Sequence, residues 1–367
     1  MTRSAASRWP GGRIGAIVVG AGVLLAACGG QGASSPSGAT TAGGTTAGTP
    51  ASVPASGVPA SSDILEQTGS TITVPVTTVT GSSGDAKVTV QISVGGGPPA
   101  TVVLDTGSAG LLIDASMVGS QVVDSGQQLD KNFVGGTVPA TLAQAPVTVG
   151  GVTTASPVGI GLLQAGSGAG LFDGTSGLLG IGTANGPTLN ADLFSPTLQL
   201  PAPYQAGSML DISPTGTGTW TLGPVTAPAG AVAVPLVAVS GPPTTYPDGA
   251  PAYAKDVQLC WTIGSAAPAC GPTDLDIGNP NTALNSTTFA ALDAGGDLLA
   301  SGTGIVMGTT EKQTLWSFTS GQTQGQNVVE LAALGANTEF NTGIEYFYAN
   351  TVAFDYANGR LLLAPKG

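Results

Sequence analysis

Two short acidic turns contain the residues whose types and spacing could do chemistry. Asp105 stands between the apolar runs 102–104 and 109–113 and opens an Asp-Thr-Gly-Ser turn. Later in the chain, Asp276 follows Leu275 and opens a related turn, Asp-Ile-Gly-Asn. A carboxylate among apolar side chains is costly unless hydrogen bonds or a partner stabilise it. Two such acids facing each other could hold and activate a water molecule, which is general acid–base chemistry.

The lack of histidine restricts the other chemistry that this chain could do. No histidine occurs among the 367 residues, which excludes Ser-His and Cys-His nucleophilic machinery. Without histidine, the three cysteines are too few for an ordinary zinc site. Acid–base chemistry therefore falls to carboxylates, tyrosine, lysine or water, and we expect neither a metal nor another cofactor.

Residues 1–27 have the pattern of an export signal. Three arginines precede or border an apolar run at 14–27, which is too short for a comfortable membrane span. The run ends in Leu-Ala-Ala followed by Cys28, which resembles the bacterial lipobox, in which the cysteine is lipidated and becomes the new N-terminus. We therefore expect an exported protein, anchored by lipid on Cys28 to the outer face of the bacterial cytoplasmic membrane or cell envelope. The alternative is a plain signal peptide with an incidental cysteine.

The remaining cysteines and the charge agree with export. Cys260 and Cys270 are left as a close pair, and an oxidising compartment favours a disulfide between them. After Cys28 the chain has six basic residues and 21 acidic ones, a net charge of −15. This charge argues against a nucleic-acid partner and against docking on anionic lipid through a basic patch.

The elements that must position the two acids are predicted to be strands. Residues 28–62 are rich in Gly, Ser, Thr, Ala and Pro and indicate a flexible tether. Beyond it, apolar residues alternate with polar ones at 88–94, and Gly-Gly at 150–151 predicts a tight hairpin. Many short strands with Gly- and Pro-rich turns indicate an all-β protein. The repeated acidic turn predicts two related halves, 63–228 and 229–367.

At this point the chain resembles the pepsin-like aspartic proteases over residues 70–366. Four segments carry the resemblance, namely 104–108, 172–182, 216–223 and 352–365. The resemblance implies a bilobal all-β fold, with two pseudo-symmetric lobes and a cleft between them. Each segment alone is a modest signal, but all four occur in the family's order and spacing.

The resemblance assigns roles to the residues of the first turn. Asp105 and Asp276 would be the catalytic carboxylates, with a shared water between them. Ser108 would donate to the outer oxygen of Asp105, and Gly107 would bring its backbone N–H close to the carboxylate. Thr106 would reach across to the opposite turn and hold the two turns together.

The second turn departs from the family pattern. Ile277 stands where the family has Thr or Ser, so half of the cross-lobe contact is missing. Gly278 matches the family, and Asn279 replaces a hydroxyl residue but could still donate an amide N–H to Asp276. Residues 341–343, Asn-Thr-Gly, stand where an apolar pair before Gly is expected. An alternative reading makes Asp276 an ordinary turn acid.

The resemblance also predicts a flap over the acids. Phe133 falls at the position of the family's flap tyrosine, and Gly135 and Gly136 would form its mobile tip. Leu112 replaces the tryptophan that usually receives the tyrosine hydroxyl, so the two changes match each other. Phe133 could close over a substrate, or it could be a core aromatic residue.

These features predict a lipid-anchored, extracytoplasmic aspartic endopeptidase that acts as a monomer on peptide or protein substrates. Ile277, Asn279, Phe133 and Leu112 also allow a catalytically silent relative that binds peptide, glycan or protein in the same cleft. A third possibility is an unrelated all-β lipoprotein in which the four segments are accidental.

Overall fold

The computed structural model describes residues 66–67, 69–81, 84–133, 136–183, 193–292, 298–323, 325–331 and 339–366. The predicted signal peptide 1–27, Cys28 and the tether that follows it lie outside the described residues, as does Gly135. Ser61–Gly367 forms one compact unit. Within the described ranges, no helix is both long enough and apolar enough to cross a membrane.

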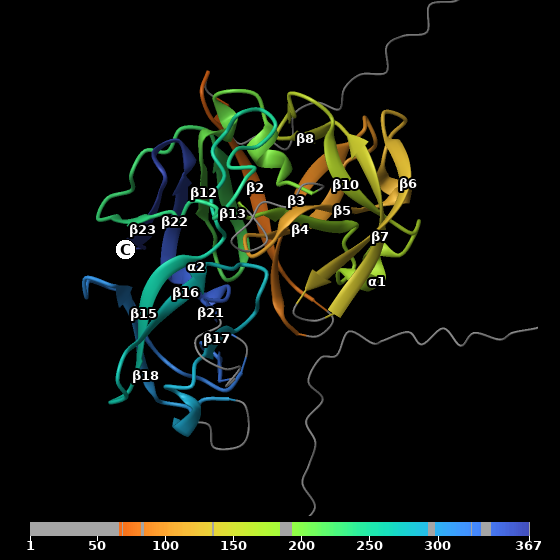
Figure 1. The fold of residues 1–367 in the computed structure, drawn as a ribbon. Helices are drawn as coiled ribbons and strands as arrows, with labels where there is room; N and C mark the ends of the chain where they lie inside the picture. The colour runs from red at the N-terminus through yellow and green to blue at the C-terminus, as the bar shows by residue number, and fades with distance from the viewer. Residues whose placement is uncertain are drawn as a thin grey trace, which may run out of the picture. The chain divides into compact units, whose positions relative to one another are not determined.

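The larger sheet contains sixteen strands within the described part of the chain. Figure 1 labels many of them, among them β2, β13, β12 and β22. In the order of their pairing, thirteen of them are β14 (Val232–Pro235), β23 (Arg360–Pro365), β22 (Asn350–Asp355), β12 (Ser208–Asp211), β13 (Gly216–Leu222), β2 (Ile72–Thr80), β3 (Ala86–Val94), β4 (Ala100–Asp105), β11 (Gly177–Ile181), β5 (Ala109–Asp114), β10 (Val158–Leu163), β7 (Gly136–Ala145) and β6 (Val123–Phe133). The other three are β1 (Glu66–Gln67), β8 (Val147–Val149) and β9 (Val152–Thr153).

The second sheet is built only from later residues. Its paired order is β19 (Thr314–Thr319), β18 (Gly304–Thr309), β15 (Val257–Ile263), β16 (Ala269–Asp274), β21 (Glu339–Asn341), β17 (Thr282–Asn285) and β20 (Val329–Glu330). The described helices are short, namely α1 (Gly168–Leu171), α2 (Glu345–Ala349) and the 3₁₀ turns η1 (Ala115–Met117), η2 (Pro196–Gln199), η3 (Tyr204–Ala206), η4 (Ala290–Leu292) and η5 (Tyr356–Asn358). The all-β prediction is therefore confirmed.

Local sequence explains individual strands and turns. In β2, Ile72, Val74 and Val76 are buried and alternate with partly exposed residues, as expected for a strand with one face on the core. The predicted hairpin forms between β8 and β9, where Gly150 and Gly151 both have positive φ, 52° and 76°. Two consecutive positive φ values suit the hairpin turn whose twist matches its strands, and glycine adopts them readily.

The two acidic turns occupy equivalent places in the two sheets. Strand β11 lies between β4 and β5, parallel to β4 and antiparallel to β5. Strand β21 lies in the same way between β16 and β17, parallel to β16 and antiparallel to β17. Asp105 ends β4, and Asp276 follows two residues after the end of β16. The repeated acidic turn thus belongs to a repeated strand arrangement.

The two halves of the sequence are joined in one sheet and one core. Strands β14, β22 and β23 come from the C-terminal half, yet β22 pairs with β12 of the N-terminal half. Buried residues of both halves, among them Leu104 and Trp261, belong to one hydrophobic cluster. The predicted disulfide is present and links Cys260 to Cys270, which are direct partners in the β15–β16 pairing.

Candidate active site

The first turn holds the Asp105 carboxylate from both sides. The backbone N–H of Gly107 donates to Asp105 Oδ1 at 2.8 Å, and the Ser108 hydroxyl donates to Asp105 Oδ2. The side chain is buried, with 6% of its surface exposed. These donors stabilise a negative charge at a place where apolar neighbours alone would disfavour it.

The second turn holds Asp276 through a different set of donors. The N–H of Gly278 donates to Asp276 Oδ1 at 2.7 Å, and the Asn341 side-chain amide donates to Asp276 Oδ2 at 2.8 Å. Asn341 is itself oriented, because its Oδ1 accepts from the N–H of Gly343 at 2.8 Å. The Thr342 hydroxyl accepts from the N–H of Asp276 at 3.2 Å.

Asn341 therefore takes the part that the sequence suggested for Asn279. The Asn279 side-chain oxygen instead accepts from the N–H of Asn281, and its backbone carbonyl accepts from the N–H of Ile344. The Asn279 side chain bonds within its own turn, whereas β21 ends at Asn341, directly beside Asp276. The polar residues at 341–342 looked out of place in the sequence, and that departure was the signal for this contact.

The two carboxyl groups meet, and two glycines make room for them. A Cβ atom on Gly107 would lie 2.4 Å from Asp276 Cγ, and one on Gly278 would lie 2.5 Å from Asp105 Oδ1. Each acid thus packs against the glycine of the opposite turn, a space that no other residue type leaves open. One point is close to both carboxyl groups, because the same Cβ atom on Gly278 would lie 3.1 Å from Asp276 Oδ1.

The surroundings of Asp276 favour its protonated form. Burial and the neighbouring charge of Asp105 raise the pKa of Asp276 to about 7, against the hydrogen bonds from Asn341 and Gly278, which lower it. Two acids in such contact titrate as a coupled pair with separated apparent pKa values. Between those values the pair holds one proton, so it contains one acid and one base.

Thr106 links the two turns. Its hydroxyl donates to the carbonyl of Leu275 at 2.6 Å and accepts from the N–H of Ile277 at 2.9 Å. Ile277 offers no hydroxyl in return, and its side chain is buried in the main core with 1% of its surface exposed. The contact is thus made from one side, and apolar packing replaces the other side.

Phe133 and Gly136 pair with each other at the end of the β6–β7 ribbon. The Phe133 ring is half-buried and meets the edge of Phe172, with 6.5 Å between ring centroids. It packs against a small buried cluster that includes Leu112 and Phe172. Apolar packing therefore holds Phe133 in place, although neither Phe133 nor Leu112 can form the hydrogen bond of a Tyr–Trp pair.

Two lysines near the pair were not singled out from the sequence. Lys255 forms ion pairs with Asp274, at 2.9 Å, and with Glu339. Asp274 is two residues before Asp276, and its pKa is raised well above the usual value by burial and by the nearby Asp276 charge. The acids Asp256, Asp274 and Glu339 lie close enough together to bind a metal ion, but the Lys255 ammonium already supplies a positive charge there.

The second lysine, Lys131, is on β6 two residues before Phe133, and 7% of its surface is exposed. Lys131 and Phe133 are two residues apart, so their side chains point to the same face of the strand. Basic residues are rare in this chain, and that rarity was the signal that could have drawn attention to it.

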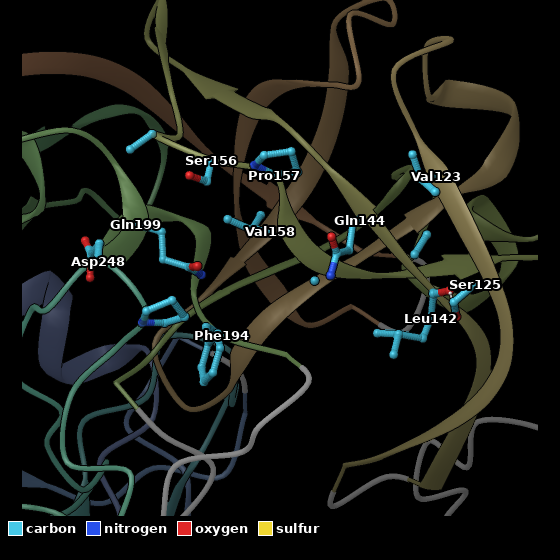
Figure 2. A pocket seen from close by; sticks show the side chains of 14 residues that line it. Val123, Ser125, Leu142, Gln144, Ser156, Pro157, Val158, Phe194, Gln199 and Asp248 are labelled. Atoms are coloured by element: carbon cyan, nitrogen blue, oxygen red, sulfur yellow. Dashed lines mark hydrogen bonds between the residues drawn. The ribbon is translucent and has the colours of Figure 1, made fainter.

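A separate cavity of about 460 Å³ lies at the other end of the β6–β7 ribbon. Val123 pairs with Gln144 at this end, whereas Phe133 pairs with Gly136 at the end near the acids. Asp105 and Asp276 do not line it. Figure 2 shows its walls, with Val123, Ser125 and Leu142 on one side and Phe194, Gln199 and Asp248 on the other.

The chain resembles known proteins in sequence and in fold. A sequence model of the PE-PGRS C-terminal aspartyl peptidase-like domain matches residues 72–361. No curated protein matches the chain significantly. The crystal structure of an aspartic proteinase from Irpex lacteus aligns with a TM-score of 0.55 and 18% identity, and it covers 80% of this chain and 98% of that one. The predicted pepsin-like fold is thereby confirmed.

Proposed function

Because the chain belongs to the PE-PGRS C-terminal aspartyl peptidase-like family, we propose that it is an aspartic endopeptidase. The observation that carries the proposal is the contact between Asp105 and Asp276, each held by its own turn and each packed on the glycine of the other turn. An ordinary turn acid has no reason to meet the buried Asp105 at the junction of two related strand arrangements.

In the proposed reaction, the pair activates one water molecule. Asp105, ionised and held by Gly107 and Ser108, takes a proton from the water as its oxygen attacks the peptide carbonyl carbon. Asp276, whose raised pKa keeps it protonated in acid, gives its proton to the carbonyl oxygen. The proton on Asp105 then passes to the leaving nitrogen as the carbon–nitrogen bond breaks. Asp276 recovers a proton from a hydroxyl group of the intermediate as that bond breaks, which returns the pair to its starting state.

The test is cleavage of an unfolded protein between pH 3 and pH 7 by the chain from residue 63 onwards, with and without pepstatin. We expect Asp105→Asn and Asp276→Asn each to lower the rate by a factor of about a thousand, because each removes one partner in proton transfer. Glu311→Gln is the matched control, since it removes one exposed carboxylate far along the chain.

A second candidate is a silent relative that binds peptides without cutting them, which the missing hydroxyl at Ile277 favours. Cleavage that survives in either Asn variant would overturn the endopeptidase proposal. A well-folded protein that binds pepstatin but cleaves nothing at any tested pH would point to the silent relative instead.

We further propose that the protein is exported and held at the cell surface by lipid on Cys28. The support is the signal pattern of residues 1–27, the residues before Cys28 and the tether up to residue 62. The disulfide between Cys260 and Cys270 fits an oxidising compartment.

A further inference from the structure

Lys131 is a buried cation that the proposed reaction does not use. Only six basic residues follow Cys28, and Lys131 is among them. An ammonium group with 7% of its residue's surface exposed loses most of its hydration, which costs free energy unless nearby groups stabilise the charge. The groups around Lys131 must therefore stabilise its positive charge.

The contacts of Lys131 connect the ribbon to the first acidic turn. Its Nζ donates to the carbonyl of Ala109 at 2.9 Å, and Ala109 directly follows Ser108, which holds Asp105. The same Nζ lies 6.0 Å from the centre of the Phe133 ring. One side chain thus joins strand β6, the aromatic ring at its end and the start of β5.

The charges that face Lys131 come from both halves of the chain. Asp105, at the end of β4, favours the charged lysine, and Lys255, before β15, disfavours it. Asp276 lies beside Asp105, and Asp130 on β6 itself is exposed. Burial lowers the pKa of Lys131 to about 8, so the ammonium stays charged throughout the acid range.

We propose that Lys131 is a positioning residue, whose ammonium group holds β6 against the first acidic turn and keeps the negative charge of the carboxyl pair on Asp105. This inference rests on the proposed function, because it assigns Asp105 the base and Asp276 the acid. A neutral hydrogen-bond donor could hold the Ala109 carbonyl equally well. The positive charge of Lys131 adds a Coulomb attraction to Asp105, which a neutral donor at the same place would not supply.

The first test compares Lys131→Met with Lys131→Arg and with Lys312→Met, an exposed lysine in a turn. Loss of the positive charge makes ionisation of the pair harder, so the lower apparent pKa of the pair rises. We expect the acid limb of the kcat/KM profile to move up by about one pH unit in Lys131→Met, which is about a tenfold loss at the acid end. Lys131→Arg should restore the acid limb, and Lys312→Met should not move it.

The second test needs neither activity nor a folded Lys131→Met protein. By thermodynamic reciprocity, if Lys131 stabilises the charge on Asp105, then Asp105 stabilises the charge on Lys131. NMR titration of the Lys131 ammonium should therefore give a lower pKa in Asp105→Asn than in the wild type, by about half a unit or more. Glu311→Gln should leave that titration unchanged.

The outcomes separate this inference from the proposed function. An unchanged acid limb in Lys131→Met, or an unchanged Lys131 titration in Asp105→Asn, overturns the role of Lys131. A wild-type protein that cleaves nothing overturns the endopeptidase, and the NMR titration then still decides whether Lys131 and Asp105 share charge.

Discussion

At the scale of residues, the two acids are supported by chemically different neighbours. Asp105 receives a hydroxyl and a backbone N–H, whereas Asp276 receives the Asn341 amide and a backbone N–H. Asn341 also differs from its counterpart in the first strand arrangement, since Leu178 pairs with Val103 just as Asn341 pairs with Asp274. The second half thus replaces an apolar residue by a donor to the catalytic candidate.

Replacement of Asn341 by leucine tests this support. The hydrogen bond from the Asn341 amide lowers the pKa of Asp276, because it stabilises the ionised form. Loss of this hydrogen bond should raise the pKa of Asp276 above the value of about 7. We expect the basic limb of the kcat/KM profile to move to higher pH by about one unit in Asn341→Leu. Asn279→Ala is the control and should not move the limb. Equal profiles for both variants would contradict the role given to Asn341.

At the scale of elements, the Thr106 hydroxyl joins two turns that follow strands of different sheets, β4 of the larger sheet and β16 of the second. It provides a donor for the Leu275 carbonyl and an acceptor for the Ile277 N–H. Both backbone groups belong to buried residues, so each depends on this hydroxyl. With Ile277 opposite, no second hydroxyl can take over.

Thr106→Val should therefore destabilise the protein without changing its volume greatly. Two buried backbone groups lose their partner, and we expect the free energy of unfolding to fall by about 2 to 4 kcal/mol. Urea unfolding followed by tryptophan fluorescence measures the change. Thr106→Ser keeps the hydroxyl and should stay within about 1 kcal/mol of the wild type. If Thr106→Val unfolds at the wild-type urea concentration, the contact does not stabilise the junction.

At the scale of the whole molecule, the chain combines an acidic folded unit with a predicted anchor. A net charge of −15 after Cys28 disfavours docking of such a unit on anionic lipid, so the proposed attachment to a membrane depends on the lipid predicted at Cys28. The tether up to residue 62 would then give the folded unit room to meet large substrates.

Cys28→Ala tests the anchor in a bacterial host that processes lipoproteins. We expect the wild type in the detergent-extractable membrane fraction and Cys28→Ala in the soluble fraction, because the acyl chains supply the membrane affinity. Ser35→Ala, a change within the tether, should stay with the membrane. A wild-type protein that is equally soluble would show that Cys28 is incidental.

Short-range pattern was enough to predict much of this protein. Alternation of apolar and polar residues predicted β3, the Gly-Gly pair predicted the β8–β9 hairpin, and the close pair of cysteines predicted the disulfide. These features depend on neighbours along the chain or on covalent chemistry, so the sequence by itself determines them. The repeated acidic turn predicts two related halves, and each of the two turns lies beside the same arrangement of three strands.

Only the tertiary structure decided which distant groups meet. The sequence pointed to Asn279 beside Asp276, but strand β21 brings Asn341 there, and β6 brings Lys131 to the Asp105 turn. Strand pairing across long separations fixes such contacts, and a period of two cannot show which strand lies next to which. The sequence by itself therefore determined the kinds of elements and the two acids, whereas the tertiary structure decided what surrounds those acids, because that depends on long-range strand order.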